Sequence, residues 1–168
     1  HSSDRYLTPM GIPGPWHERL PHFYFKDAQL QGNELQSEYF VARQHAVAAM
    51  QAVAQLRPQL APILQVTEVR TVAADKLWLS PAYEQNIVGI HFNWHRDWPG
   101  VQQFLPTLEA TLAPFQPRPH WGKLFDMTPA QVQAGYPRLA DFQALARTYD
   151  PQGKFRNALL DSYVFGEV

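Results

Sequence analysis

The sequence contains no cysteine among its 168 residues. Disulfide bonds, thiolate catalysis and cysteine-ligated zinc or iron–sulfur centres are therefore excluded. It has no apolar run near the ~20 residues of a membrane-spanning helix, and no charged segment followed by an apolar one after His1. We expect no transmembrane segment and a cytoplasmic location. Because His1 is not an initiator methionine, we also expect the chain to be part of a longer protein.

Charged residues are scarce, at 17% of the chain, and the net charge is −1. Without a basic run, the chain is not expected to bind nucleic acid or an anionic membrane. No P-loop, G-x-G-x-x-G or G-x-S-x-G motif is present. His91 and His95, like His17 and His22, lack a helical metal-binding frame and a third ligand, so no metal site is expected.

Aromatic residues (13%) and 15 prolines are abundant, which indicates a globular domain with many fixed bends. Alternating apolar and polar residues predict strands over 34–40, 63–73, 86–94 and 120–125. Helical spacing predicts helices over 43–56, 99–112, 129–135 and 138–147, with a kink or a late start at Pro106. This order favours an α+β fold: an antiparallel sheet with helices packed on one face, followed by a helical C-terminal tail.

Polar side chains share faces on three of the predicted strands. Glu68 and Arg70 point the same way, as do His91 and Asn93, and Lys123 lies on the third strand. If these strands are neighbours, the five side chains converge on one patch rich in donors and acceptors, which suits a polyhydroxylated ligand. The alternative is that each is an ordinary solvated sheet face, with Glu68 and Arg70 forming a surface ion pair.

Seven stretches together resemble one family. They are GPWHERLPHF (14–23), ELQSEY (34–39), EVRTVAADKLWLSPAY (68–83), HFNW (91–94), RPHWGK (118–123), YPRLADF (136–142) and DPQGKFRNA (150–158). The chain is similar to the C-terminal half of the sugar-alcohol oxidases (alditol and xylitol oxidases). These are close to the D-arabinono-1,4-lactone oxidases, in the vanillyl-alcohol oxidase superfamily of FAD enzymes.

The resemblance implies a division of the chain into two parts. Residues 1–125 correspond to an N-terminally incomplete cap domain that binds substrate. Residues 126–168 correspond to a helical tail that returns to an FAD-binding domain absent from this sequence. FAD would be bound mainly by that missing domain, so the isolated chain is expected to be inactive.

The resemblance also assigns roles to residues. Those matching polyol-binding positions are Glu68, Arg70, His91, Asn93 and Lys123. Arg70 and Lys123 would be catalytic, because cations stabilise the alkoxide that forms as a terminal hydroxyl is oxidised. Hydride would pass from the terminal carbon to the flavin, which converts the polyol to an aldose, and O2 would then reoxidise the flavin to give H2O2. His120 and Asn157 are candidate cofactor contacts. Asn93 replaces the family's usual threonine, so the preferred polyol stays open.

Two other interpretations remain. The chain could be a stand-alone carbohydrate-binding module, because its five tryptophans and polar sheet face also suit sugars. It could instead be a structural domain without catalysis. Under the oxidase interpretation, low charge and many large aromatic residues predict an exposed apolar docking face through which the isolated chain self-associates.

Overall fold

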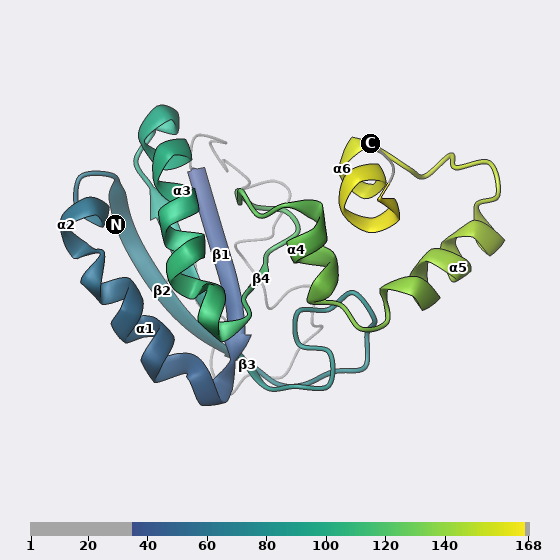
Figure 1. The fold of residues 1–168 in the computed structure, drawn as a ribbon, viewed down its shortest axis with the longest axis horizontal. Helices are drawn as coiled ribbons and strands as arrows, with labels where there is room; N and C mark the ends of the chain where they lie inside the picture. The colour runs from purple at the N-terminus through teal and green to yellow at the C-terminus, as the bar shows by residue number, and fades with distance from the viewer. Residues whose placement is uncertain (1–34, 167–168) are drawn as a thin grey trace, which may run out of the picture. The chain divides into compact units, whose positions relative to one another are not determined.

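A computed structural model describes residues 35–166. The irregular segment predicted for 1–23 lies outside the described residues. The sheet has four strands in the order β2-β3-β1-β4, namely β1 (Leu35–Ala42), β2 (Leu64–Val72), β3 (Ile87–Trp94) and β4 (Arg118–Pro119). Every neighbouring pair is antiparallel. The predicted α+β class is confirmed, and the first three predicted strands are present with nearly the expected bounds (Figure 1).

The element order places β3 between β1 and β2, which are joined through helices. A one-turn 3-10 helix (η4, Arg43–His45) leads into α1 (Ala46–Gln55) and α2 (Arg57–Leu60), and α3 (Trp98–Leu112) connects β3 to β4. This is a split β-α-β arrangement repeated on each side of the sheet centre. Because both long connections carry helices, α1 and α3 cover one face of the sheet and leave the other for polar side chains.

The core fills the layer between the sheet and these helices. Strand residues Ile90, Phe92 and Trp94 pack against α1 and against Leu105 and Leu108 of α3. Two side-chain hydrogen bonds lie in this layer. In the first, the Trp94 Nε1 donates to Ser37 Oγ at 3.0 Å. The Tyr39 hydroxyl donates to Glu109 Oε1 at 2.6 Å. The buried face is therefore apolar or hydrogen-bonded throughout these contacts, as a stable core requires.

Pro106 lies inside α3, and it neither divides the helix nor delays its start. The helix begins at Trp98, where the Asp97 side chain accepts a hydrogen bond from Gly100 N, and it continues past Pro106 to Leu112. Val101, Phe104, Leu105, Leu108 and Leu112 are all buried along one side of it. Packing of this apolar side outweighs the single backbone hydrogen bond that an interior proline removes.

The strand predicted over 120–125 is wrong. β4 ends at Pro119, and the following residues form a turn in which Lys123 N donates to His120 O at 3.1 Å. His120 Nδ1 accepts from Gly122 N at 3.0 Å, which tightens the turn. The Trp121 side chain bonds outside this turn: its Nε1 donates to Leu79 O at 3.0 Å. Local side-chain hydrogen bonds of this kind compete with a sheet ladder.

The tail beyond β4 is helical, as predicted. It contains α4 (Pro129–Ala134), α5 (Leu139–Tyr149), α6 (Ala158–Leu160) and a π-type turn (η6, Asp161–Phe165). Thr128 and Gln131 form a capping box at the start of α4, which satisfies backbone donors that the first helical turn leaves free. Within residues 35–166, no helix has both the length and the apolar character needed to span a membrane.

The core packing predicts that Leu108→Ala lowers the free energy of unfolding by about 3 kcal/mol, because a buried leucine leaves a cavity when truncated. Leu108 is fully buried, whereas Leu77 is 70% exposed. Leu77→Ala is therefore the matched control and is expected to have little effect. Urea unfolding followed by circular dichroism measures both. Equal losses in the two variants would contradict the assigned core.

Candidate functional site

Three strands align polar residues in one row on the sheet face opposite the helices. Glu38 of β1 lies directly across from His91 of β3, and His91 lies across from Glu68 of β2. Cross-strand partners share a face of the sheet and are close enough for side-chain contact. Arg70, two residues beyond Glu68, stands on the same face.

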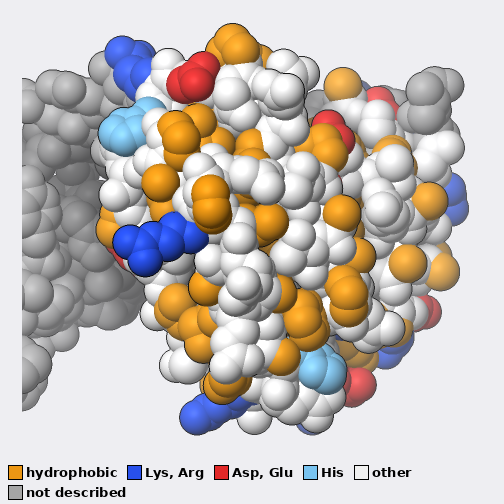
Figure 2. All heavy atoms as spheres, turned by 60° about the vertical axis from the view of Figure 1, so that its left-hand side comes forward, with side chains coloured by type: hydrophobic (Ala, Val, Ile, Leu, Met, Phe, Trp, Pro, Cys, Tyr) orange, Lys and Arg blue, Asp and Glu red, His pale blue; other side chains and the backbone are white. Residues whose placement is uncertain are grey.

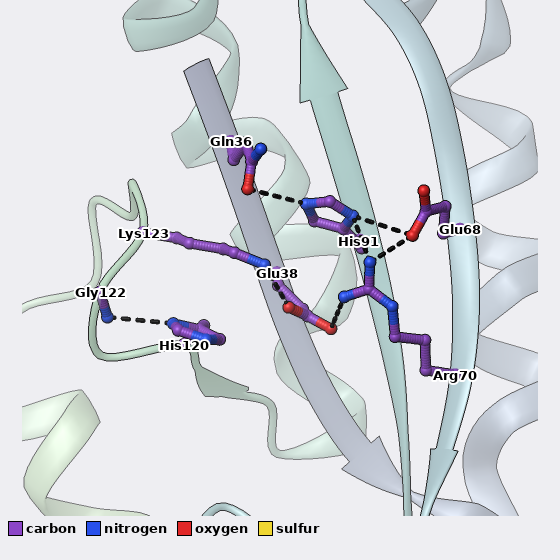
Figure 3. Close-up of polar contacts among 8 residues, drawn as sticks. All are labelled: Gln36, Glu38, Glu68, Arg70, His91, His120, Gly122 and Lys123. Carbon is purple, nitrogen blue, oxygen red and sulfur yellow. Dashed lines mark hydrogen bonds and ion pairs between the residues drawn. The ribbon is translucent and has the colours of Figure 1, made fainter. Parts of the chain in front are cut away.

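Glu38 is the centre of the resulting network, shown in Figure 3. Its carboxylate is almost fully buried, with 3% of the side chain exposed. Oε1 accepts from Arg70 Nη1 at 3.1 Å, and Oε2 accepts from Lys123 Nζ at 2.5 Å. Arg70 Nη2 also donates to the Glu68 carboxylate. One buried carboxylate thus holds two cations that come from different parts of the chain, β2 and the turn after β4.

His91 joins the same network through both ring nitrogens. Its Nδ1 lies 3.2 Å from Arg70 Nη2 and 3.6 Å from the Glu68 carboxylate. Its Nε2 lies 3.3 Å from Gln36 Oε1. Burial lowers the pKa of His91, and the positive charges of Lys123 and Arg70 lower it further. The Arg70 guanidinium, by hydrogen bonding, lowers the pKa of the Glu68 carboxyl.

A glycine makes room for the central ion pair. Gly89 stands opposite both Arg70 and Phe40 in the sheet. A Cβ at this position would lie 2.8 Å from Glu38 Oε1 and 3.0 Å from the Phe40 ring. Both distances are shorter than van der Waals contact allows, so the absent side chain is what lets the carboxylate lie flat over β3.

Three of the predicted site residues are in direct contact with one another: Glu68, Arg70 and His91. Lys123 is joined to them through Glu38. The fifth, Asn93, is on the same face, across from Gln36. Its Oδ1 is buried, and among the described residues no group donates a hydrogen bond to it. Lys123 reaches the network from a turn, not from the strand that the sequence pattern predicted.

The two candidate cofactor contacts are engaged locally. His120 Nδ1 accepts from Gly122 N, its ring stacks on Phe40, and burial lowers its pKa, with the nearby charge of Lys123 acting in the same direction. Asn157 caps α6 by accepting from Leu160 N at 3.0 Å. Within the described residues, no group of three His, Asp or Glu side chains could hold a metal ion.

Sequence reasoning missed Glu38 and Gln36. Both lie in the segment ELQSEY, which was correctly predicted as a strand, and both belong to its polar positions. Alternation alone therefore held a signal for them. What the pattern did not contain was the pairing of this strand with β3, which brings Glu38 opposite His91.

The arrangement is suited to recognising hydroxyl groups. Glu68 and Arg70 are 47% and 44% exposed, so the network opens to solvent on the β2 side. It offers charged donors, charged acceptors and a neutral imidazole within one surface. A hydroxyl both donates and accepts, and its hydrogen bonds to charged partners are the strongest available.

The fold and the site define an α+β domain with an open polar sheet face. The chain belongs to the D-arabinono-1,4-lactone oxidase family, whose model matches residues 29–163. It is 51% identical over 156 residues to an alditol oxidase of Streptomyces sp. (strain IKD472 / FERM P-14339), covering 93% of this chain and 38% of that protein.

The chain also matches more distant relatives. The chain is 30% identical over 155 residues to the L-gulono-1,4-lactone dehydrogenase of Mycobacterium tuberculosis (strain ATCC 25618 / H37Rv), covering 92% of this chain and 36% of that protein. It is 27% identical over 124 residues to the L-gulonolactone oxidase of Bos taurus, covering 71% and 28%. The chain thus spans less than two fifths of the length of these oxidoreductases.

Acidification is expected to destabilise the folded chain through His91 and His120, whose pKa values are lowered by burial. An unfolded histidine titrates near ~6.5. Above that pH both states hold neutral rings, whereas below it the unfolded chain binds protons that the folded chain does not. The free energy of unfolding should therefore fall as pH drops through ~6.5.

Urea unfolding at pH ~7.5 and ~5.5, together with NMR titration of the two rings, measures this effect. His91→Gln removes one of the two groups, so it should reduce the loss of stability between the two pH values. A His91 ring that titrates at or above the unfolded value in the folded chain would contradict the assignment.

Proposed function

We propose that this chain is the substrate-binding part of an FAD-dependent oxidase. The full enzyme would oxidise the terminal hydroxyl of a polyol such as xylitol or sorbitol, with O2 as acceptor, to give an aldose and H2O2. The observation that supports this most is the network in which Glu38 holds Arg70 and Lys123 together on an open sheet face. The 51% identity to an alditol oxidase gives independent support.

In this proposal, Arg70 and Lys123 bind the reacting hydroxyl. Their positive charges favour its deprotonated form, and that preference grows as the alkoxide develops in the transition state. Glu68 and His91 bind the neighbouring hydroxyls. The buried Oδ1 of Asn93, which no described residue hydrogen-bonds, accepts from a further hydroxyl and so contributes to the choice of polyol.

FAD, which accepts the two electrons of the alcohol oxidation, would be bound mainly by the part of the longer relatives that this chain does not span. His120 and Asn157 are the proposed contacts from this chain. Because His120 Nδ1 and Asn157 Oδ1 already accept backbone hydrogen bonds from Gly122 and Leu160, these contacts would use other atoms of the two side chains. The role of this chain is to bind and orient the polyol.

A chimera tests the catalytic proposal. In it, this chain replaces the matching region of the Streptomyces alditol oxidase. Lys123→Ala is expected to lower kcat/KM for sorbitol about 100-fold, because a cation that acts on a developing alkoxide contributes mainly in the transition state. Arg43→Ala, an exposed change in η4, is the control and should leave kcat/KM unchanged. Equal effects would contradict the role of Lys123.

The isolated chain distinguishes the oxidase part from a carbohydrate-binding module. As an oxidase part it is expected to purify without a flavin spectrum and to bind sorbitol negligibly by calorimetry, because the partner domain supplies one wall of the site. Millimolar sorbitol binding without flavin would favour the module. A yellow protein with a flavin spectrum would contradict the proposal that FAD is bound mainly outside this chain.

We further propose that the isolated chain self-associates through β2. Within the described residues, β2 pairs on one side only, with β3. Val69 on it is 51% exposed beside an apolar groove of about 450 Å³ between α1 and β2. Figure 2 shows hydrophobic side chains scattered over the side of the molecule on which α1 lies. Antiparallel pairing of two copies about Val69 matches Glu68 with Arg70 of the second copy, and opposite charges stabilise such a cross-strand pair.

Light scattering on the isolated chain is expected to show a dimer at high concentration. Val69→Lys should abolish it, because a lysine on an edge strand opposes strand pairing. Val47→Lys is the control, since Val47 is 63% exposed on α1 and not on the strand edge. A chain that stays monomeric, or a dimer lost only with Val47→Lys, would contradict pairing through β2.

A further inference from the structure

Glu38 stands at the only point of the described network where both cations meet a single carboxylate. We propose that Glu38 is a positioning residue that makes the site select neutral polyols over sugar acids, an inference that rests on the proposed function. It does so in two ways. It fixes Arg70 and Lys123 side by side, and it cancels the excess positive charge that would otherwise attract a carboxylate ligand.

The positioning role follows from burial and origin. Arg70 comes from β2 and Lys123 from the turn after β4, so backbone structure alone does not bring their charged ends together. Two like charges repel at this range. Both oxygens of Glu38 are occupied, one by each cation, and the carboxylate is 3% exposed. Glu68 contacts Arg70 but is 47% exposed, so solvent screens its charge more strongly than that of Glu38.

The fold reserves space for this carboxylate. Gly89 beneath it carries no side chain that would strike Oε1. The backbone of Glu38 is fixed as well. Its carbonyl oxygen accepts a hydrogen bond from His120 N at 2.9 Å, at the start of the turn that carries Lys123. The side chain of Glu38 therefore binds Arg70 and Lys123, while its main chain binds the turn that carries Lys123. A residue with this burial and these contacts has little freedom to move when a ligand binds.

The charge count gives the selectivity. Arg70 and Lys123 supply two positive charges, and Glu38 and Glu68 supply two negative ones. His91 adds none while its ring is neutral. A neutral polyol needs only hydrogen bonds and is accepted by such a site. A sugar acid must give up hydration of its carboxylate and finds no net positive charge in return. Removing Glu38 leaves one uncompensated cation, which reverses that preference.

Sorbitol and gluconate are the probes, because they have the same carbon count and the same free terminal hydroxyl and differ in one carboxylate. In the chimera described above, the KM for sorbitol and the inhibition constant of gluconate against sorbitol are measured. Glu38→Gln is expected to lower the ratio of gluconate inhibition constant to sorbitol KM about tenfold, since one charge within ion-pair range of the ligand has been removed. Glu38→Asp keeps the charge and should largely restore the ratio.

Two further variants complete the design. Glu84→Gln also removes one negative charge, but from an exposed residue in the loop between β2 and β3, so its ratio should stay at the wild-type value. Glu68→Gln removes a negative charge from the exposed side of the network and should shift the ratio in the same direction as Glu38→Gln, by less. It carries the test if Glu38→Gln does not fold.

The outcomes separate this inference from the proposed function. A wild-type chimera that does not oxidise sorbitol overturns the proposed function and the selectivity that rests on it. A wild-type chimera that oxidises sorbitol, while Glu38→Gln (or, if that variant is unfolded, Glu68→Gln) leaves the ratio unchanged, overturns the role of Glu38 alone. A shift in Glu84→Gln equal to that in Glu38→Gln also overturns it, because the effect would then be one of overall charge.

Discussion

A carboxylate removed from water must be compensated, and in this chain the compensation of Glu38 organises one whole face of the sheet. An unpaired buried charge would cost several kcal/mol, so β2 and the turn after β4 must each deliver a cation to the same place. The antiparallel register provides the geometry by lining up Glu38, His91 and Glu68 across three strands. Arg70 then reaches three of the network's acceptors from one side.

The two faces of the sheet differ in composition and in what they contribute to the fold. The helix-covered face holds the large apolar residues of β3 and α3 and hydrogen-bonds its few polar groups internally. Because that layer is packed like an organic crystal, it fixes the strands against one another. The opposite face can therefore present charged groups at set spacings without having to stabilise the fold through them. A site built on strands is more precise than one carried on loops alone.

Strand alternation was sufficient for part of this site. Glu68 with Arg70, and His91 with Asn93, could be paired from the sequence because a period of two depends only on identifying each strand. Register and strand order depend on long-range packing, which is why Glu38 escaped notice although its strand was correctly predicted. Lys123 was placed in the patch from the local pattern HWGKLF, which indicated a strand that is in fact a turn, and the family resemblance gave it the same role. The course of α3 through Pro106 was likewise decided by tertiary packing, which propensity does not report.

The turn that carries Lys123 is bonded to β1 at both of its ends. His120 N donates to Glu38 O, and Leu124 N donates to Gln36 O, each at 2.9 Å. The two strand residues that receive these bonds are the same two whose side chains enter the polar network. The turn and the middle of β1 consequently form one mechanical unit, in which the lysine cannot drift without breaking backbone bonds at the sheet edge. An inserted or deleted residue in the turn would therefore move the cation away from its carboxylate.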